Sequence, residues 1–145
     1  MHQLLAIVSG LLVAAQGAIN SGMKGMVGSA VIAALINNLV GACALAAVLV
    51  FSRSSIPSGS KLLEVPGYYW LAGVLGASFI WTAATVIPKL GVSTTLALVI
   101  SGQLVGALLI DHFGLLGVQQ RAFSWPTWVG LALVVVGALL LTRTR

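Results

Sequence analysis

Residues 65–110 read VPGYYWLAGVLGASFIWTAATVIPKLGVSTTLALVISGQLVGALLI, in which Lys89 is the one charged side chain. The apolar run on each side of Lys89 is long enough to cross a bilayer, because about 20 residues, each rising about 1.5 Å, span the hydrocarbon core. Between the runs, Pro88-Lys89-Leu90-Gly91 combines a helix breaker with a charge and a glycine. This stretch therefore predicts a tight turn between two antiparallel transmembrane helices, over residues 66–87 and 91–111.

The rest of the chain repeats this pattern of uncharged runs separated by single charges. Uncharged runs cover residues 3–23, 25–52 and 122–142, and we expect further helices over residues 3–22, 27–51 and 125–142. Gly22-Met23-Lys24-Gly25 predicts a tight turn between the first two helices. Five spans in 145 residues leave almost nothing for a soluble part, so we expect an all-α membrane protein with a single transmembrane domain over residues 1–145.

The composition excludes a water-soluble protein. Hydrophobic residues make up 59% of the chain and charged residues 6%, whereas soluble domains carry about 25% charged residues. The net charge of +5 does not indicate nucleic-acid binding, because the basic residues stand singly at the ends of apolar runs. We therefore expect contact with membrane lipid and no nucleic-acid partner.

The first apolar run is expected to remain as a transmembrane helix. Ala14-Ala15-Gln16-Gly17-Ala18 offers small residues for signal cleavage, but Met1-His2-Gln3 holds no Lys or Arg and the run is long for a signal peptide. Cys43 is the only cysteine. It cannot form an internal disulfide and is expected to be a small packing residue in the second helix.

Polar and aromatic residues mark the other loops. The longest polar segment runs from Ser52 to Pro66, and the aromatic residues of Pro66-Gly67-Tyr68-Tyr69-Trp70 then place the start of the third helix at headgroup depth. Asp111 to Pro126 forms the last connection. Trp125 and Trp128 indicate the interface where the fifth helix begins.

The basic residues hardly determine the orientation of the chain in the membrane. One face of a five-span protein would carry Arg53, Lys61 and Arg121, and the other would carry Lys24, Lys89, Arg143 and Arg145. Two interpretations remain: Arg143 and Arg145 fix one N-out, C-in orientation, or the chain inserts both ways and pairs as an antiparallel homodimer. We favour dual topology, because five helices enclose little space and transporters commonly place substrate between inverted repeats.

Polar side chains inside the membrane are candidates for a substrate site, because each needs a partner or a water-filled cavity. Gln16 and Asn20 are one turn apart on the first helix, and Gln103 lies near the middle of the fourth. Trp81 is too deep for an interfacial belt and is either core filling or an apolar wall of the site. Each amide has a structural alternative as a hydrogen bond between helices. The other intramembrane polar residues are Asn37, Asn38, Thr82, Thr85 and Ser101, and the hydroxyls are expected to bond to their own helix.

Small residues are spaced to line helix faces. Gly73 with Gly76 and Gly102 with Gly106 predict close helix packing or a dimer contact, because backbones approach closely in lipid at small residues.

Ionisable residues are scarce. Glu64 and Asp111 are the only acids, and both lie at the ends of apolar runs. Asp111-His112 is interpreted either as an interfacial contact to Arg121 or the loop backbone, or as a gating or coupling pair. His2, His112 and Cys43 provide no metal-ligand cluster, and there is no Ser-His-acid set or phosphate loop. We therefore expect no enzyme activity, no cofactor and no metal.

Five motifs together resemble the YdcZ-type family of small bacterial inner-membrane proteins in the drug/metabolite transporter superfamily. They are Gln16-x-x-x-Asn20, Gly73-x-x-Gly76, Pro88-x-x-Gly91, Gly102-Gln103-Leu104 and Asp111-His112-Phe113-Gly114. The resemblance implies five helices similar to half of a ten-helix transporter, an inverted pair, and transport of a small solute. It favours Gln16, Asn20, Gln103 and Asp111 as site or gating residues. Asn37-Asn38 departs from the family pattern, so any role of these two is specific to this chain.

The sequence thus predicts an inner-membrane transporter of a small organic solute that works by alternating access as an antiparallel homodimer. Uncharged amides at Gln16, Asn20 and Gln103, beside Trp81, predict a neutral or weakly charged, partly apolar substrate. The alternatives are a non-transporting membrane subunit or assembly partner, and a heterodimer with an oppositely oriented homologue.

Overall fold

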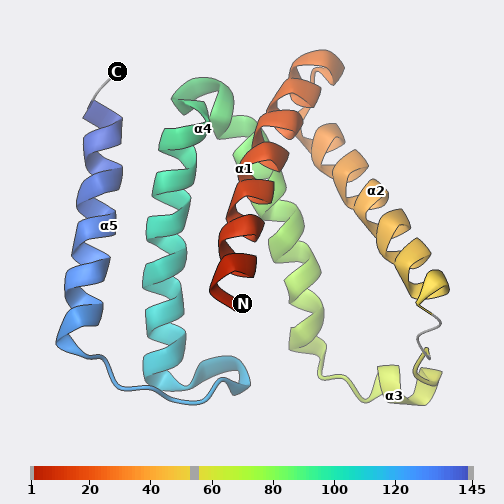
Figure 1. Cartoon of the computed structure of the whole chain (residues 1–145). Coiled ribbons are helices and arrows are strands. Elements are labelled where there is room, and N and C mark those ends of the chain that lie inside the picture. The colour runs from red at the N-terminus through yellow and green to blue at the C-terminus, as the bar shows by residue number, and fades with distance from the viewer. Residues whose placement is uncertain (1, 53–55, 144–145) are drawn as a thin grey trace. The chain divides into compact units, whose positions relative to one another are not determined.

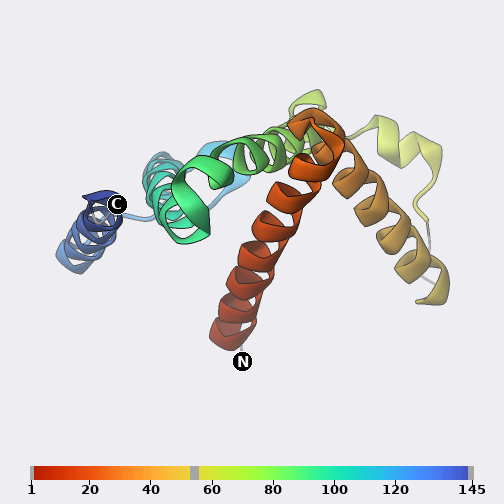
Figure 2. The same ribbon diagram turned by 90° about the horizontal axis from the view of Figure 1, so that it is seen from above.

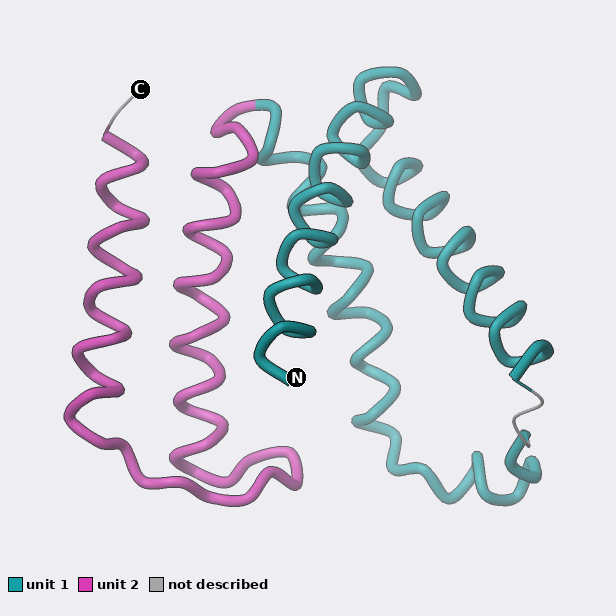
Figure 3. Tube along the Cα trace, viewed as in Figure 1, with its two compact units in different colours: residues 1–88 teal, residues 89–145 magenta. Residues whose placement is uncertain are grey.

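A computed structural model describes residues 2–52 and 56–143. Arg53 and Arg145, which entered the comparison of basic residues between the two faces, lie outside the described residues, as do Ser54 and Ser55 of the polar loop. The chain divides into two compact units, residues 1–88 and 89–145 (Figure 3).

The first unit contains two long helices joined by a two-residue turn. α1 covers His2–Val27 and α2 covers Ala30–Phe51. The two helices contact each other next to the turn and diverge away from it (Figures 1 and 2). A short helix α3 at Gly59–Leu63 and a 3-10 helix η1 at Gly67–Trp70 follow, and then the first part of α4, Leu71–Phe113.

The predicted turn at residues 22–25 is wrong. α1 continues through Gly22 and Gly25, and the chain turns instead at Gly28, whose φ is 74°. A glycine takes this left-handed conformation without a Cβ clash, so Gly28 ends α1. Ser29 then begins α2 by accepting a hydrogen bond from the backbone nitrogen of Ile32 at 3.3 Å. The second helix therefore starts at Ala30 rather than at residue 27.

The break predicted at residues 88–91 is present. α4 runs as one element over Leu71–Phe113, but Gly91 has the non-helical angles φ 72° and ψ 165°. Gly91 separates two segments, of about 30 Å before it and about 33 Å after it. Each matches the hydrocarbon thickness of a bilayer, and the break is also where the two units divide.

The second unit holds the rest of α4, a 3-10 helix η2 at Leu115–Gly117 and α5 at Trp125–Arg143. Thr94 on α4 donates to the carbonyl oxygen of Leu141 on α5 at 3.5 Å. Thr94, Thr95 and Ala138 are the buried positions of this unit among the described residues. Small side chains thus make the contact between α4 and α5.

Few apolar side chains are buried. Among the described residues, the buried apolar ones are Ala30, Ala33, Ala34, Ala83, Ala84, Ile87 and Ala138. Most Leu, Ile and Val side chains are exposed instead, which requires an apolar surrounding. Four described helices are long and apolar enough to cross a membrane, namely His2–Val27, Ala30–Phe51, Gly67–Phe113 and Trp125–Arg143. With Gly67–Phe113 divided at Gly91, the expected all-α membrane architecture is confirmed.

Candidate functional site

The most deeply buried large side chain in the described chain is an amide. Asn20 on α1 is 2% exposed, and its Oδ1 accepts a hydrogen bond from Nδ2 of Asn37 on α2 at 3.1 Å. An unpaired amide in hydrocarbon costs several kcal/mol. The bond between the two asparagines removes part of this cost and joins α1 to α2.

The Gly28–Ser29 turn determines the depth of this pair. Asn37 is two helical turns, about 10 Å along the helix, from the start of α2 at Ala30. The pair therefore lies nearer the end of α2 that follows the turn than the middle of that helix.

A hollow of about 280 Å³ opens beside the asparagine pair. We call it the amide hollow. It is lined by Gln16, Ile19, Asn20, Met23, Ile36, Asn37, Val40 and Gly41. Three amides and five apolar residues make a surface that offers both hydrogen-bond donors and acceptors within an apolar wall, which suits a small solute of mixed polarity.

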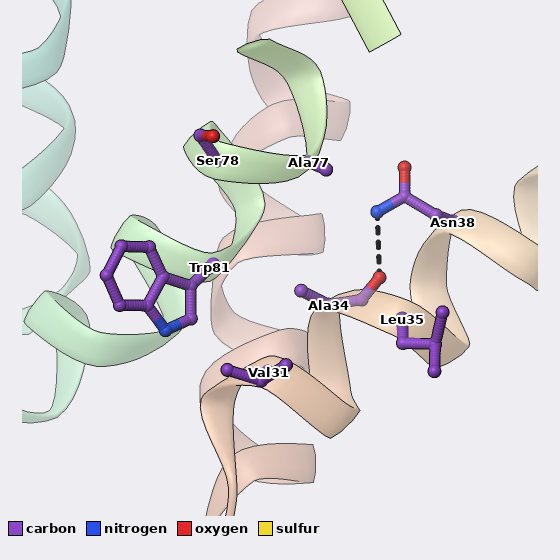
Figure 4. A pocket seen from close by; sticks show the side chains of 7 residues that line it. All are labelled: Val31, Ala34, Leu35, Asn38, Ala77, Ser78 and Trp81. Carbon is purple, nitrogen blue, oxygen red and sulfur yellow. Dashed lines mark hydrogen bonds between the residues drawn. The ribbon is translucent and has the colours of Figure 1, made fainter. Parts of the chain in front are cut away.

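A second hollow lies between α2 and the first segment of α4. Its volume is about 390 Å³, and we call it the Trp81 hollow (Figure 4). It is lined by Val31, Ala34, Leu35, Asn38, Ala77, Ser78 and Trp81. The Trp81 side chain is 48% exposed and forms one wall.

The structure brings only some of the predicted site residues together. Gln16 and Asn20 share the amide hollow, whereas Trp81 lines the separate Trp81 hollow. Gln103 belongs to the second unit and its side chain is exposed. The sequence interpretation gave Asn37 little weight, although Asn37 is the hydrogen-bond partner of Asn20.

Two of the three hydroxyls that were expected to bond to their own helices do so. Thr85 donates to the carbonyl oxygen of Trp81 and Ser101 to that of Ala97, both at 2.8 Å. These bonds satisfy the hydroxyl donors locally.

Asp111 and His112 lie at the end of α4, against the loop that leads to α5. The backbone nitrogen of Arg121 donates to the carbonyl oxygen of Asp111, and Nε2 of Gln120 donates to that of His112, both at 2.8 Å. The His112 ring stacks on Phe123 with a centroid distance of 4.6 Å. Its Nδ1 is buried with no hydrogen-bond partner among the described residues. These contacts hold the loop to the end of α4.

The glycines chosen for packing face open space. A Cβ built on Gly73, Gly76, Gly102 or Gly106 meets no atom within 4 Å. These positions therefore make no close helix contact within the described chain, and their role against a second chain stays a prediction. Close approach occurs at Gly17, where a Cβ would lie 2.9 Å from Cδ1 of Ile87.

Comparison with known proteins assigns the chain to a family. The family described as "Putative inner membrane exporter, YdcZ" matches residues 1–140. The chain belongs to the YdcZ family. It is 34% identical over 112 residues to the inner membrane protein YdcZ of Escherichia coli (strain K12), an alignment that covers 77% of this chain and 74% of that protein. No solved structure gives a significant match.

The family and the helices agree on a broad assignment. The chain is a multi-pass inner-membrane protein of a family of membrane exporters, which is not an enzyme class. The expected resemblance to the YdcZ-type family is confirmed. No group of three His, Cys, Asp or Glu residues within the described ranges could hold a metal ion.

Proposed function

We propose that this protein exports a small organic solute, neutral or weakly charged and partly apolar, by alternating access. The observation that carries the proposal is the amide hollow, in which Gln16, Asn20 and Asn37 meet between two apolar helices of a chain that belongs to the YdcZ family. Polar groups inside a membrane are retained at sites that bind and move solutes.

Hydrogen-bond capacity in the amide hollow supports an uncharged substrate. The Asn37–Asn20 bond uses one donor and one acceptor, so the second lone pairs and the remaining amide hydrogens of the pair are available to a ligand. Gln16 adds a complete amide at the rim. No charged residue lines the hollow, so a full charge on the solute would enter without a counter-ion, at a high cost.

In this proposal two chains complete one transporter. A single chain has five helical segments, and inverted pairs of such units place the solute at their shared midplane. We propose an antiparallel dual-topology homodimer in which Gln103 contributes a further amide and Asp111 with His112 acts in gating. The exposure of Gln103 supports a role against a ligand or a second chain, because an unpartnered amide in lipid is costly.

Binding and flux measurements test this function. A thermal-shift screen of the purified protein against neutral metabolites and apolar drugs identifies a ligand, because binding to the native state raises its stability. Flux of that ligand is then measured in proteoliposomes. We expect Gln16→Ala and Gln103→Ala to reduce flux by about tenfold or more, while the proteins remain folded.

The matched control is Gln119→Ala, which removes the same side chain from the exposed loop before α5. It should transport like the wild type. Binding and flux that are absent from the wild type, or unchanged in Gln16→Ala, would instead favour a membrane subunit in which the amides only join helices.

A further inference from the structure

The Trp81 hollow is lined by two polar residues besides Trp81, namely Asn38 and Ser78. Each of these two residues donates one hydrogen bond within its own helix. Nδ2 of Asn38 donates to the carbonyl oxygen of Ala34 at 2.8 Å, and Oγ of Ser78 donates to that of Val74 at 2.8 Å. Ser78 therefore keeps only acceptor lone pairs, whereas Asn38 keeps the unpaired acceptor Oδ1 and one amide hydrogen.

Figure 4 shows how these acceptors lie around the hollow. The Asn38 oxygen points away from the bonded Ala34 carbonyl, and Ser78 and Trp81 project from the facing α4 segment. The indole of Trp81 adds an aromatic face and one N–H donor. The other lining residues, Val31, Ala34, Leu35 and Ala77, are apolar.

The hollow lies away from the ends of both helices that line it. Trp81 is about 15 Å from the start of α4 at Leu71, and Asn38 is about 12 Å from the start of α2. Both lie within a hydrocarbon layer of about 30 Å. A half-exposed indole beside the unpaired Oδ1 of Asn38 favours a partner that is apolar and also supplies a donor.

We propose that the Trp81 hollow binds an apolar, ring-bearing solute through an O–H or N–H donor that bonds to Asn38 Oδ1. The ring packs on Trp81 and the donor meets an acceptor, so the same solute with its donor blocked binds poorly. This site is distinct from the amide hollow, and it rests on the proposed function only in treating the ligand as a transported solute.

A matched pair of probes tests the site. 4-Bromophenol carries a ring, a donor and a bromine that quenches nearby indole fluorescence, and 4-bromoanisole is the same molecule with the donor blocked. In nanodiscs, we expect saturable quenching by 4-bromophenol that is absent with 4-bromoanisole. Trp81→Phe should remove the saturable part and leave the quenching of Trp70, Trp125 and Trp128.

Two variants assign the hydrogen bond. Asn38→Leu should weaken binding of 4-bromophenol by about tenfold, the effect of losing one good hydrogen bond. Thr82→Val makes a similar polar-to-apolar change beside Trp81 but outside the hollow, and it should bind like the wild type. Circular dichroism of both variants confirms that they are folded.

Three results would overturn the proposal. They are equal quenching by the two probes, undiminished binding by Asn38→Leu, and quenching of Trp81 by brominated acyl chains that unbrominated phenol does not relieve, which would make the hollow a lipid contact. None of these results depends on flux. A protein that binds the probe but transports nothing would contradict the proposed function and leave this site standing.

Discussion

At the scale of single residues, the bond between Asn20 and Asn37 is the feature on which the candidate site depends. We predict that Asn37→Ala lowers the free energy of unfolding by about 1–2 kcal/mol, because it leaves the buried amide of Asn20 without its partner. Replacing both asparagines by alanine should cost less than the sum of the two single changes. Unfolding in mixed detergent micelles measures all three variants. Strictly additive losses would show that the two amides do not interact.

This pair could have been predicted from the sequence once the turn was placed correctly. Asn20 and Asn37 are equally distant from the Gly28–Ser29 turn, so two helices that meet there bring them to the same level. A glycine followed by a serine is the usual sequence of a helix end and a new N-cap. Placing the turn at Gly22–Gly25 instead shifted the expected register of the two helices, so Asn37 was not recognised as the partner of Asn20.

At the scale of the elements, replacing a glycine by alanine should have opposite effects on stability in α1 and in the turn that follows it. We predict that Gly28→Ala destabilises the protein by about 1 kcal/mol, because φ is 74° there. Gly25→Ala should be neutral or stabilise it by up to about 1 kcal/mol, because Gly25 is helical and a Cβ meets open space. Thermal unfolding in detergent measures both. A loss at Gly25 as large as at Gly28 would argue against this turn.

The contact of α1 with α4 gives a second prediction at this scale. Gly17→Val should destabilise the first unit by about 1–3 kcal/mol, because a Cβ at Gly17 would lie 2.9 Å from Cδ1 of Ile87. Gly22→Val is the control, since its Cβ meets no atom within 4 Å. Ile87→Ala in the Gly17→Val background should recover part of the loss. If Gly17→Val and Gly22→Val unfold alike, the close contact is absent.

Apolar run length predicted the long helices and the break at Gly91, but it could not predict which faces touch. In lipid both faces of a helix are apolar, so hydrophobic periodicity does not mark the packed face. Glycine spacing favoured Gly73 and Gly76, whereas the buried residues of the α4 segment before Gly91 are Ala83, Ala84 and Ile87. The short helix Gly59–Leu63 lies in a polar loop without a periodic pattern, and it was not predicted.

At the scale of the whole molecule, the exposed apolar surface requires lipid or a second chain around each unit. We predict dual topology, because the basic residues differ by only one between the two faces. A cysteine added after Arg145 in a Cys43→Ser background reports orientation through an impermeant maleimide. We expect partial labelling of intact cells and complete labelling after permeabilisation. Labelling that is complete or absent in intact cells would establish a single orientation.

The central proposal is that the amide hollow holds the transported solute. Gly41 lines this hollow with free space around it, so Gly41→Cys in a Cys43→Ser background places one thiol there. A water-soluble methanethiosulfonate should modify this thiol, and the ligand found by thermal shift should slow the reaction by about tenfold. Gly10→Cys, on α1 outside the hollow, should react slowly and without protection. A thiol at position 41 that does not react, or that reacts equally with and without ligand, would contradict the account.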